Sequence, residues 1–173
     1  MLLVLCDILY NKCEWRNKNM KWATRKNMQV DRVSSVWLIK RFIDEEAEFS
    51  FVSDEEIGGL TQQGILTFDA KDAKYKHLED PIRGKYGEKC TFQVIMESYG
   101  LSGKDKALDY FAKIIYAADI AHRNNEFIPH EGFGVWAIAK GFSMTHPNDE
   151  DKLKCTLPIY DALYEYCRYV VNS

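Results

Sequence analysis

The segment VSSVWLIKRFID, residues 33–44, constrains the fold of this chain more than any other stretch. Its apolar residues fall almost all the way round a helical wheel, so it predicts a helix with very little polar face. A helix of that kind is normally buried, and the rest of the chain must cover it. Asp31 stands just before the segment as the expected N-cap, because its carboxylate can accept the unpaired N–H groups of the first turn.

Two arginines flank the start of this helix, in the stretch TRKNMQVDR at residues 24–32. Arg25 ends the segment KWATR, which predicts a short strand, and Arg32 lies in the first turn of the helix. The positive end of the helix dipole disfavours a cation at that position. We therefore expect a negative group close to Arg32, which is Asp31, another side chain or a ligand.

Alternating patterns in the first half of the chain predict a small sheet. The predicted strands are 21–25, 47–52 and 65–69. The second of them, AEFSFV, alternates apolar and polar residues as a half-buried strand does. Because the second half is helical, the predicted class is α+β, a small sheet of short strands in the N-terminal half packed against a helical C-terminal half.

Helical patterns dominate after residue 90. Thr91 is the expected cap of a helix that Gly100 ends, and residues 105–118 predict an amphipathic helix. The apolar face of 105–118 comprises Leu108, Phe111, Ala112 and Ile115. Gly141 is expected to stop a short helix over 134–140. Pro147 is expected to begin a helical turn and Pro158 the last helix. The predicted buried stripe of that last helix is Leu163, Tyr166, Cys167 and Val170.

Composition favours one globular domain. A chain of 173 residues with 46% hydrophobic residues can bury a sizeable core. Its formal net charge of −3 argues against general nucleic-acid binding through a basic surface. Five scattered cysteines without a CxxC motif predict reduced thiols in a cytoplasm. The opening MLLVLCDILY is too short for a membrane span, so we expect a cytoplasmic protein with no membrane partner.

The domain boundary is expected at Met20. Residues 1–19 bear no clear relation to the rest of the chain, and 20–173 form the expected single domain. We hypothesise that Met20 is the native start and that 1–19 is a non-native extension. An additional docking helix is the competing interpretation. Mass spectrometry of the natively expressed protein would reject the hypothesis by showing an intact N-terminus at Met1.

Arg25 and Arg32 are the first candidates for ligand binding. A six-residue link separates them, which allows both to point into one crevice. Two guanidinium groups and the N–H donors of a helix start can hold a tetrahedral oxyanion. His77, in the lysine-rich loop 70–89, could also donate to that anion if the loop folds over the arginines. Ion pairing is the alternative, of Arg32 with Asp31 or Asp119 and of Arg25 with the acidic block 44–56.

Several carboxylates stand at the ends of predicted elements, where ligand-holding acids often lie and where ordinary caps lie more often. They are Asp31, Asp69, Asp119 and Glu131. A divalent metal held by His77, Asp119 and Glu131 would make the protein a metal-dependent enzyme, although no HExxH spacing is present. Cys90 adjoins a helix start, which could lower its pKa. Besides oxyanion binding and metal-dependent catalysis, a third possibility is a purely structural domain that binds a partner.

A set of motifs resembles one family, the C-terminal domain of the ChrB chromate-resistance proteins. They are TR-x6-R at 24–32, DRVSSVWLIKRFIDEEAEFSFV at 31–52, FD at 68–69, His77, CTF at 90–92, EG at 131–132 and PIYDALYEYC at 158–167. The resemblance covers Met20 to Arg168. It implies a cytoplasmic protein of bacterial chromate-resistance systems, in which full-length members are chromate-responsive transcriptional regulators.

The resemblance also implies a site. The chromate-responsive residues proposed for the family fall on Arg25, Arg32 and His77, with chromate or a similar tetrahedral oxyanion as the partner. Residues 1–19 are too short to replace the family's N-terminal DNA-binding region, so we expect a stand-alone domain without direct promoter binding. Chromate and sulfate share shape and charge. Selective binding of chromate over sulfate would need either a fit to the size and hydrogen bonds of the anion or a redox step with a thiol such as Cys90.

Overall fold

A computed structural model describes residues 19–78, 89–121 and 128–173. Its sheet has three parallel strands in the order β2-β1-β3. They are β1 (Lys21–Arg25), β2 (Glu48–Val52) and β3 (Leu66–Phe68). The three predicted strands are thus confirmed, with ends that differ by at most one residue. All but the last residue of the expected extension 1–19 lies outside the described residues.

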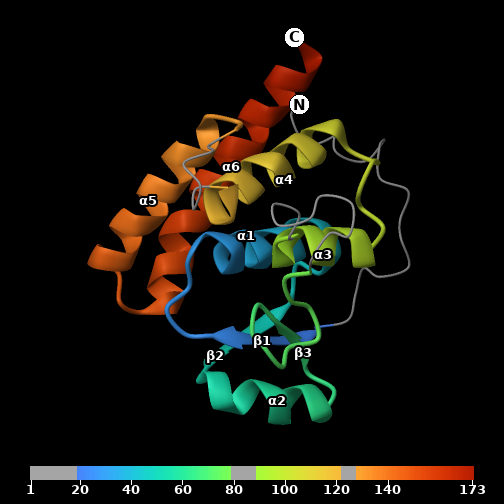
Figure 1. The fold of residues 1–173 in the computed structure, drawn as a ribbon, viewed down its shortest axis with the longest axis vertical. Helices are drawn as coiled ribbons and strands as arrows, with labels where there is room; N and C mark the ends of the chain where they lie inside the picture. Colours follow the sequence, from blue (N-terminus) through green and yellow to red (C-terminus); the bar gives the residue numbers. More distant parts are fainter. Residues whose placement is uncertain (1–18, 79–88, 122–127) are drawn as a thin grey trace.

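Helices connect the parallel strands and cover both faces of the sheet (Figure 1). Helix α1 (Val30–Leu38) and a π-helical segment (Ile39–Ile43) lead from β1 to β2 on one face. Helix α2 (Asp54–Gln62) leads from β2 to β3 on the other face. Helix α2 was not predicted from the sequence. Its signal is a capping box, in which the Glu56 carboxylate accepts a hydrogen bond from the Ser53 N–H at 2.9 Å.

Helix α1 is the buried centre of the molecule, as its sequence predicted. Every one of its residues except Arg32 is buried. Trp37 stacks on Phe111 of the helical half, with ring centroids 4.5 Å apart. The predicted N-cap was wrong, because Gln29 holds that position and Asp31 is the second residue of the helix.

The helical half packs over α1 as a second layer (Figure 1). It comprises α3 (Thr91–Ser98), α4 (Lys106–Asp119), α5 (Glu131–Thr145) and α6 (Asp149–Asn172). The predicted apolar face of α4 is buried in the same core cluster as α1. The α+β class is therefore confirmed, with parallel strands interleaved with helices.

Two predicted helix ends were wrong. Helix α5 continues through Gly141, since one glycine in a helix interior costs only about 1 kcal/mol. Helix α6 is a single helix of 24 residues with Pro158 inside it. Proline there removes one backbone hydrogen bond, but Thr156 and Tyr160, two residues before and after the exposed Pro158, are both buried. Of the predicted buried stripe, only Cys167 is buried, since Leu163 and Val170 are partly exposed and Tyr166 is 43% exposed.

None of the helices in the described ranges is both long and apolar enough to cross a membrane.

Candidate functional site

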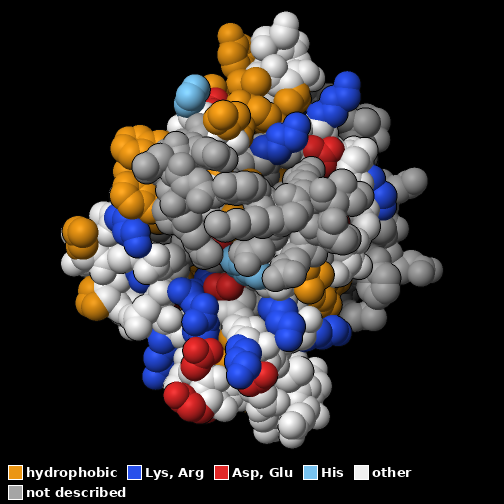
Figure 2. Space-filling model, viewed as in Figure 1, with side chains coloured by type: hydrophobic (Ala, Val, Ile, Leu, Met, Phe, Trp, Pro, Cys, Tyr) orange, Lys and Arg blue, Asp and Glu red, His pale blue; other side chains and the backbone are white. Residues whose placement is uncertain are grey.

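A cavity with a volume of about 540 Å³ opens at the carboxyl edge of the sheet. Arg25 ends β1, Asp69 follows β3 and Asp54 begins α2, so the parallel strands deliver these side chains to one edge. The lining residues are Arg25, Gln29, Asp31, Arg32, Asp54, Asp69, Ala70, Lys71, Lys76, His77 and Asp119. Figure 2 shows basic and acidic side chains gathered together over the sheet and α2.

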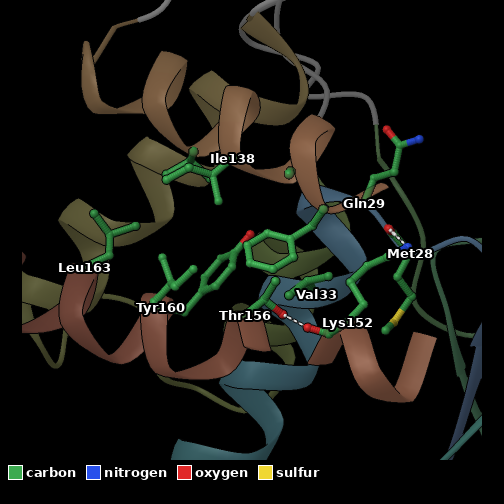
Figure 3. A pocket seen from close by; sticks show the side chains of 12 residues that line it. Met28, Gln29, Val33, Ile138, Lys152, Thr156, Tyr160 and Leu163 are labelled. Atoms are coloured by element: carbon green, nitrogen blue, oxygen red, sulfur yellow. Dashed lines mark hydrogen bonds between the residues drawn. The ribbon is translucent and has the colours of Figure 1, made fainter. Parts of the chain in front are cut away.

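A second pocket, between α1, α5 and α6, is apolar and has a volume of only about 20 Å³ (Figure 3). Ligand sites usually measure about 300–1,000 Å³. Size and charge therefore favour the cavity at the sheet edge as the ligand site.

The two arginines meet at Asp69. Arg25 donates from Nε to the Asp69 carbonyl oxygen at 2.8 Å, and its NH2 nitrogen lies 3.7 Å from Asp69 Oδ2. Arg32 NH1 lies 3.4 Å from the same carboxylate oxygen. The Arg32 side chain is only 11% exposed, against 37% for Arg25. Burial lowers the pKa of Arg32, and the charge of Asp69 opposes that shift.

The alternative prediction, that both arginines form ion pairs with nearby acids, is confirmed for Arg25 but with a different partner for Arg32. Arg25 pairs with Asp54 of the acidic block at 3.5 Å. Arg32, in contrast, forms its ion pair with Asp69 and donates from NH2 to the Asn27 carbonyl oxygen at 3.0 Å. Asp69 is thus the negative group expected near Arg32 at the start of α1. In the part of the chain that the structure describes, Arg32 forms no ion pair with Asp31 or with Asp119, the two partners named in the alternative.

The link between the arginines is held by α6. Asp149, at the start of α6, accepts hydrogen bonds from the Asn27 and Met28 N–H groups at 2.8 and 2.9 Å. Buried Lys152 donates to the Met28 carbonyl oxygen at 3.1 Å (Figure 3). The same Lys152 nitrogen lies 3.2 Å from the Asp149 carboxylate. These bonds fix the backbone between β1 and α1, and therefore the positions from which both arginines extend.

His77 lies among three carboxylates. Its Nε2 atom is 2.9 Å from Asp31 Oδ2, 3.4 Å from Asp69 Oδ1 and 3.5 Å from Asp119 Oδ2. Burial disfavours the charged imidazole. The hydrogen bond to Asp31 and the charges of the three acids nevertheless raise the pKa of His77 to about 9. Burial and the Asp31 charge raise the pKa of Asp69 to about 6, against the effect of the nearby cations.

Asp31 caps a neighbouring helix instead of its own. Its two oxygens accept hydrogen bonds from the N–H groups of Thr91 and Phe92, both at 2.8 Å. These are the first two residues of α3, where the helix dipole favours a carboxylate. Cys90, not Thr91, holds the N-cap position of α3. Asp31 therefore joins α1, α3 and the His77 segment.

Glu131 lies away from this cavity. Its Oε1 atom accepts hydrogen bonds from Tyr110 at 3.2 Å and Tyr166 at 2.8 Å, on the helical half. Of the predicted metal set, the cavity brings together only His77 and Asp119. The described residues that could hold a metal ion are instead Asp31, Asp69 and His77.

Cys90 is fully buried, and burial raises the pKa of its thiol well above the ordinary value. The prediction that its place at a helix start lowers the pKa was therefore wrong. Lys71, Lys76 and Asp54 line the cavity although the sequence analysis did not select them. The signal for the two lysines was the lysine-rich run KDAKYK at 71–76, which begins two residues after Asp69, and Asp54 belongs to the acidic block 44–56.

Comparison with known proteins gives the family. A family model described as "ChrB, C-terminal domain" matches residues 22–167. The chain belongs to this family. It is also 31% identical over 146 residues to Protein ChrB of Cupriavidus metallidurans. That match covers 84% of this chain but only 40% of the relative, so the chain spans about two fifths of its length. No solved structure matches.

Proposed function

We propose that this domain binds a tetrahedral oxyanion, chromate or a similar dianion, at Arg25, Arg32 and His77 as an accessory or regulatory part of chromate resistance. The observation that carries the proposal is the meeting of two guanidinium groups in the cavity at the sheet edge. Membership of the ChrB family supports chromate as the anion.

The arginines retain donor capacity for an anion. Their NH1 and NH2 contacts with the Asp69 carboxylate, at 3.4 and 3.7 Å, are longer than charge-assisted hydrogen bonds of about 2.7–2.9 Å. Within the described ranges, the buried Nε of Arg32 has no hydrogen-bond partner. A buried donor of that kind needs an acceptor, and an oxyanion supplies several.

Charge at the cavity is nearly balanced before an anion enters. Arg25, Arg32, Lys71 and Lys76 face Asp31, Asp54, Asp69 and Asp119, four charges of each sign, and His77 adds a positive charge. An anion therefore binds where the arginines, the lysines and the His77 imidazolium together outweigh the neighbouring acids. Arginines provide forked donors that match two oxygens of such an anion.

Isothermal titration with chromate and with sulfate tests this proposal. Hydrogen bonds to charged groups contribute about 1.5–3 kcal/mol, so Arg32→Ala should weaken binding roughly tenfold to hundredfold. Arg41→Ala is the matched control, since Arg41 pairs with Asp161 elsewhere on the molecule and does not line the cavity. Equal affinity of wild type and Arg32→Ala would refute the proposal.

A further inference from the structure

Four donor atoms gather beside the arginines in the cavity at the sheet edge. They come from α1 (Asp31), the end of β3 (Asp69), the following segment (His77) and the end of α4 (Asp119). One donor atom each from Asp31, Asp69 and His77 lies within 4.8 Å of the other two. Asp119 Oδ2 adds a fourth at 3.5 Å from His77 Nε2.

A simple ion pair does not account for this arrangement. One N–H of the imidazole can serve one good acceptor, and Asp31 at 2.9 Å takes that role. The carboxylates of Asp69 and Asp119, at 3.4 and 3.5 Å, face the same nitrogen at distances too long for good hydrogen bonds. Three carboxylates around one nitrogen repel each other, and a cation with more than one positive charge would offset that repulsion.

The spacing of the donors matches a coordination shell. With metal–ligand distances of about 2.1 Å, neighbouring donors lie about 3.0 Å apart around an octahedral ion and about 3.4 Å apart around a tetrahedral one. The three distances from His77 Nε2, 2.9, 3.4 and 3.5 Å, fall at these values. The distances from His77 Nε2 are therefore those expected between one ligand atom and its neighbours in a coordination shell.

Neighbouring groups orient the donors. The Thr91 and Phe92 N–H groups hold the carboxylate of Asp31, which is only 3% exposed. Asp69 turns Oδ2 toward the arginines and Oδ1 toward His77 and the Thr91 hydroxyl, so its two oxygens serve different partners. Hydrogen-bonded support of this kind is a regular feature of metal ligands.

We propose that Asp31, Asp69 and His77, with Asp119 as a fourth donor, hold a divalent cation. A mixed carboxylate and imidazole set suits Mn²⁺, Fe²⁺ or Zn²⁺ better than Ca²⁺. Binding of the cation does not require an oxyanion, although His77 belongs to both proposed sites. Where both occur, Asp69 connects them, and this pairing of a metal with an oxyanion rests on the proposed function.

Titration of the metal-free protein with Mn²⁺, without any oxyanion, tests the site. Free Mn²⁺ gives a six-line electron paramagnetic resonance signal that is lost on binding, and we expect one Mn²⁺ per chain. Asp69→Asn and His77→Ala should each weaken binding by at least about tenfold. Asp54→Asn, which removes a carboxylate from the same cavity outside the donor set, should bind as the wild type does. Circular dichroism checks that each variant is folded.

The proposal is overturned if the wild type binds neither Mn²⁺ nor Zn²⁺, or if Asp69→Asn and His77→Ala bind as tightly as Asp54→Asn. The variant Arg25→Ala distinguishes a failure of the cation site from a failure of oxyanion binding. That variant should lose sulfate binding and keep Mn²⁺ binding, because Arg25 contacts Asp69 through its carbonyl oxygen and Oδ2. Loss of Mn²⁺ binding in Arg25→Ala would count against the assigned donor set.

Discussion

At the scale of single residues, Asp31 has the most buried carboxylate of the four acids that line the site. Its carboxylate is almost fully buried and accepts from two backbone N–H groups while contacting the His77 imidazole. Buried charges are tolerated only when they are paired and hydrogen-bonded. Asp31 meets both conditions, which explains how a charged carboxylate can be buried in the central helix.

Replacing Asp31 should therefore destabilise the fold. Asp31→Asn keeps the size of the side chain but removes its charge from the His77 imidazole and from the start of α3. Breaking a buried charge pair costs about 3–5 kcal/mol, and we expect the free energy of unfolding to fall by roughly 3 kcal/mol. Urea denaturation with a chelator present measures it. Asp72→Asn, at an exposed position, should stay within about 0.5 kcal/mol of wild type.

Asp161 gives a prediction about pH. Hydrogen bonds from Arg41, both 2.8 Å, lower the pKa of Asp161 although partial burial opposes them, and Trp37 donates a further one. A lowered folded-state pKa contributes stability above the unfolded value of about 3.9, and that stability is lost as pH falls below it. Both side chains are about 40% exposed, so solvent screens the pair.

Asp161→Asn should accordingly lower the free energy of unfolding by about 0.5–1 kcal/mol at pH 7. The difference from wild type should shrink as pH falls below about 4. Thermal melts across this range measure both quantities. A difference that stays constant with pH would show that the charge of Asp161 is not its cause.

At the scale of elements, α6 positions the arginine site although it lies about 120 residues away in sequence. Asp149 and Lys152 bind the backbone of Asn27 and Met28, the link between β1 and α1. Neither side chain was a candidate from the sequence, because nothing in the spacing of α6 relates it to the link. A backbone held by buried charges keeps its geometry before any ligand enters.

Asp149→Asn should loosen this link. We expect the Asn27 and Met28 amides to exchange with solvent at least about tenfold faster, because local opening then breaks weaker bonds. Amides in the buried face of α4 should exchange at the wild-type rate. Hydrogen exchange followed by NMR measures both sets, with Asp151→Asn, an exposed acid on the same helix, as the control. Unchanged exchange at Asn27 and Met28 would contradict the role of Asp149.

Element prediction succeeded where one local pattern decided the outcome. The segment 47–52 alternates, α1 is apolar almost all round, and α4 has one apolar face, and each of these elements is confirmed. Pro158 and Gly141 misled the prediction because packing of the neighbouring residues outweighs the local preference of one residue. Helix α2 was missed because its acids were interpreted as a charge block and the capping box at Ser53 was overlooked.

At the scale of the whole molecule, the two halves share one core. Trp37 of α1 contacts Phe111 of α4 and Tyr164 of α6. One cluster of buried residues contains members of the sheet and of α1, α3, α4 and α6. The sheet and the helical layer should therefore unfold together.

Phe111→Ala tests this shared core. Large-to-small changes of buried aromatic residues cost about 3–5 kcal/mol, and we expect a loss in that range. Urea denaturation followed by tryptophan fluorescence and by circular dichroism should give one coincident transition. Tyr169→Ala, which truncates an exposed aromatic, should change stability by less than about 0.5 kcal/mol. Two separate transitions would contradict a common core.

The site could be predicted from the sequence only in part. Arg25, Arg32 and His77 were selected from their places at a strand end, a helix start and a loop, and the fold brings all three to one cavity. Asp69 was a supporting candidate, but its position between both arginines depends on β3 lying next to β1. Glu131 was included for its place before a helix, and its hydrogen-bond partners are tyrosines of α4 and α6 outside the cavity.

The measurement that tests the central claim most directly is a crystal structure of this domain soaked in chromate, with anomalous scattering from chromium. We predict a chromium peak in the cavity at the sheet edge, within hydrogen-bonding reach of the guanidinium groups of Arg25 and Arg32. A peak elsewhere on the molecule, with no chromium at these arginines, would contradict the account.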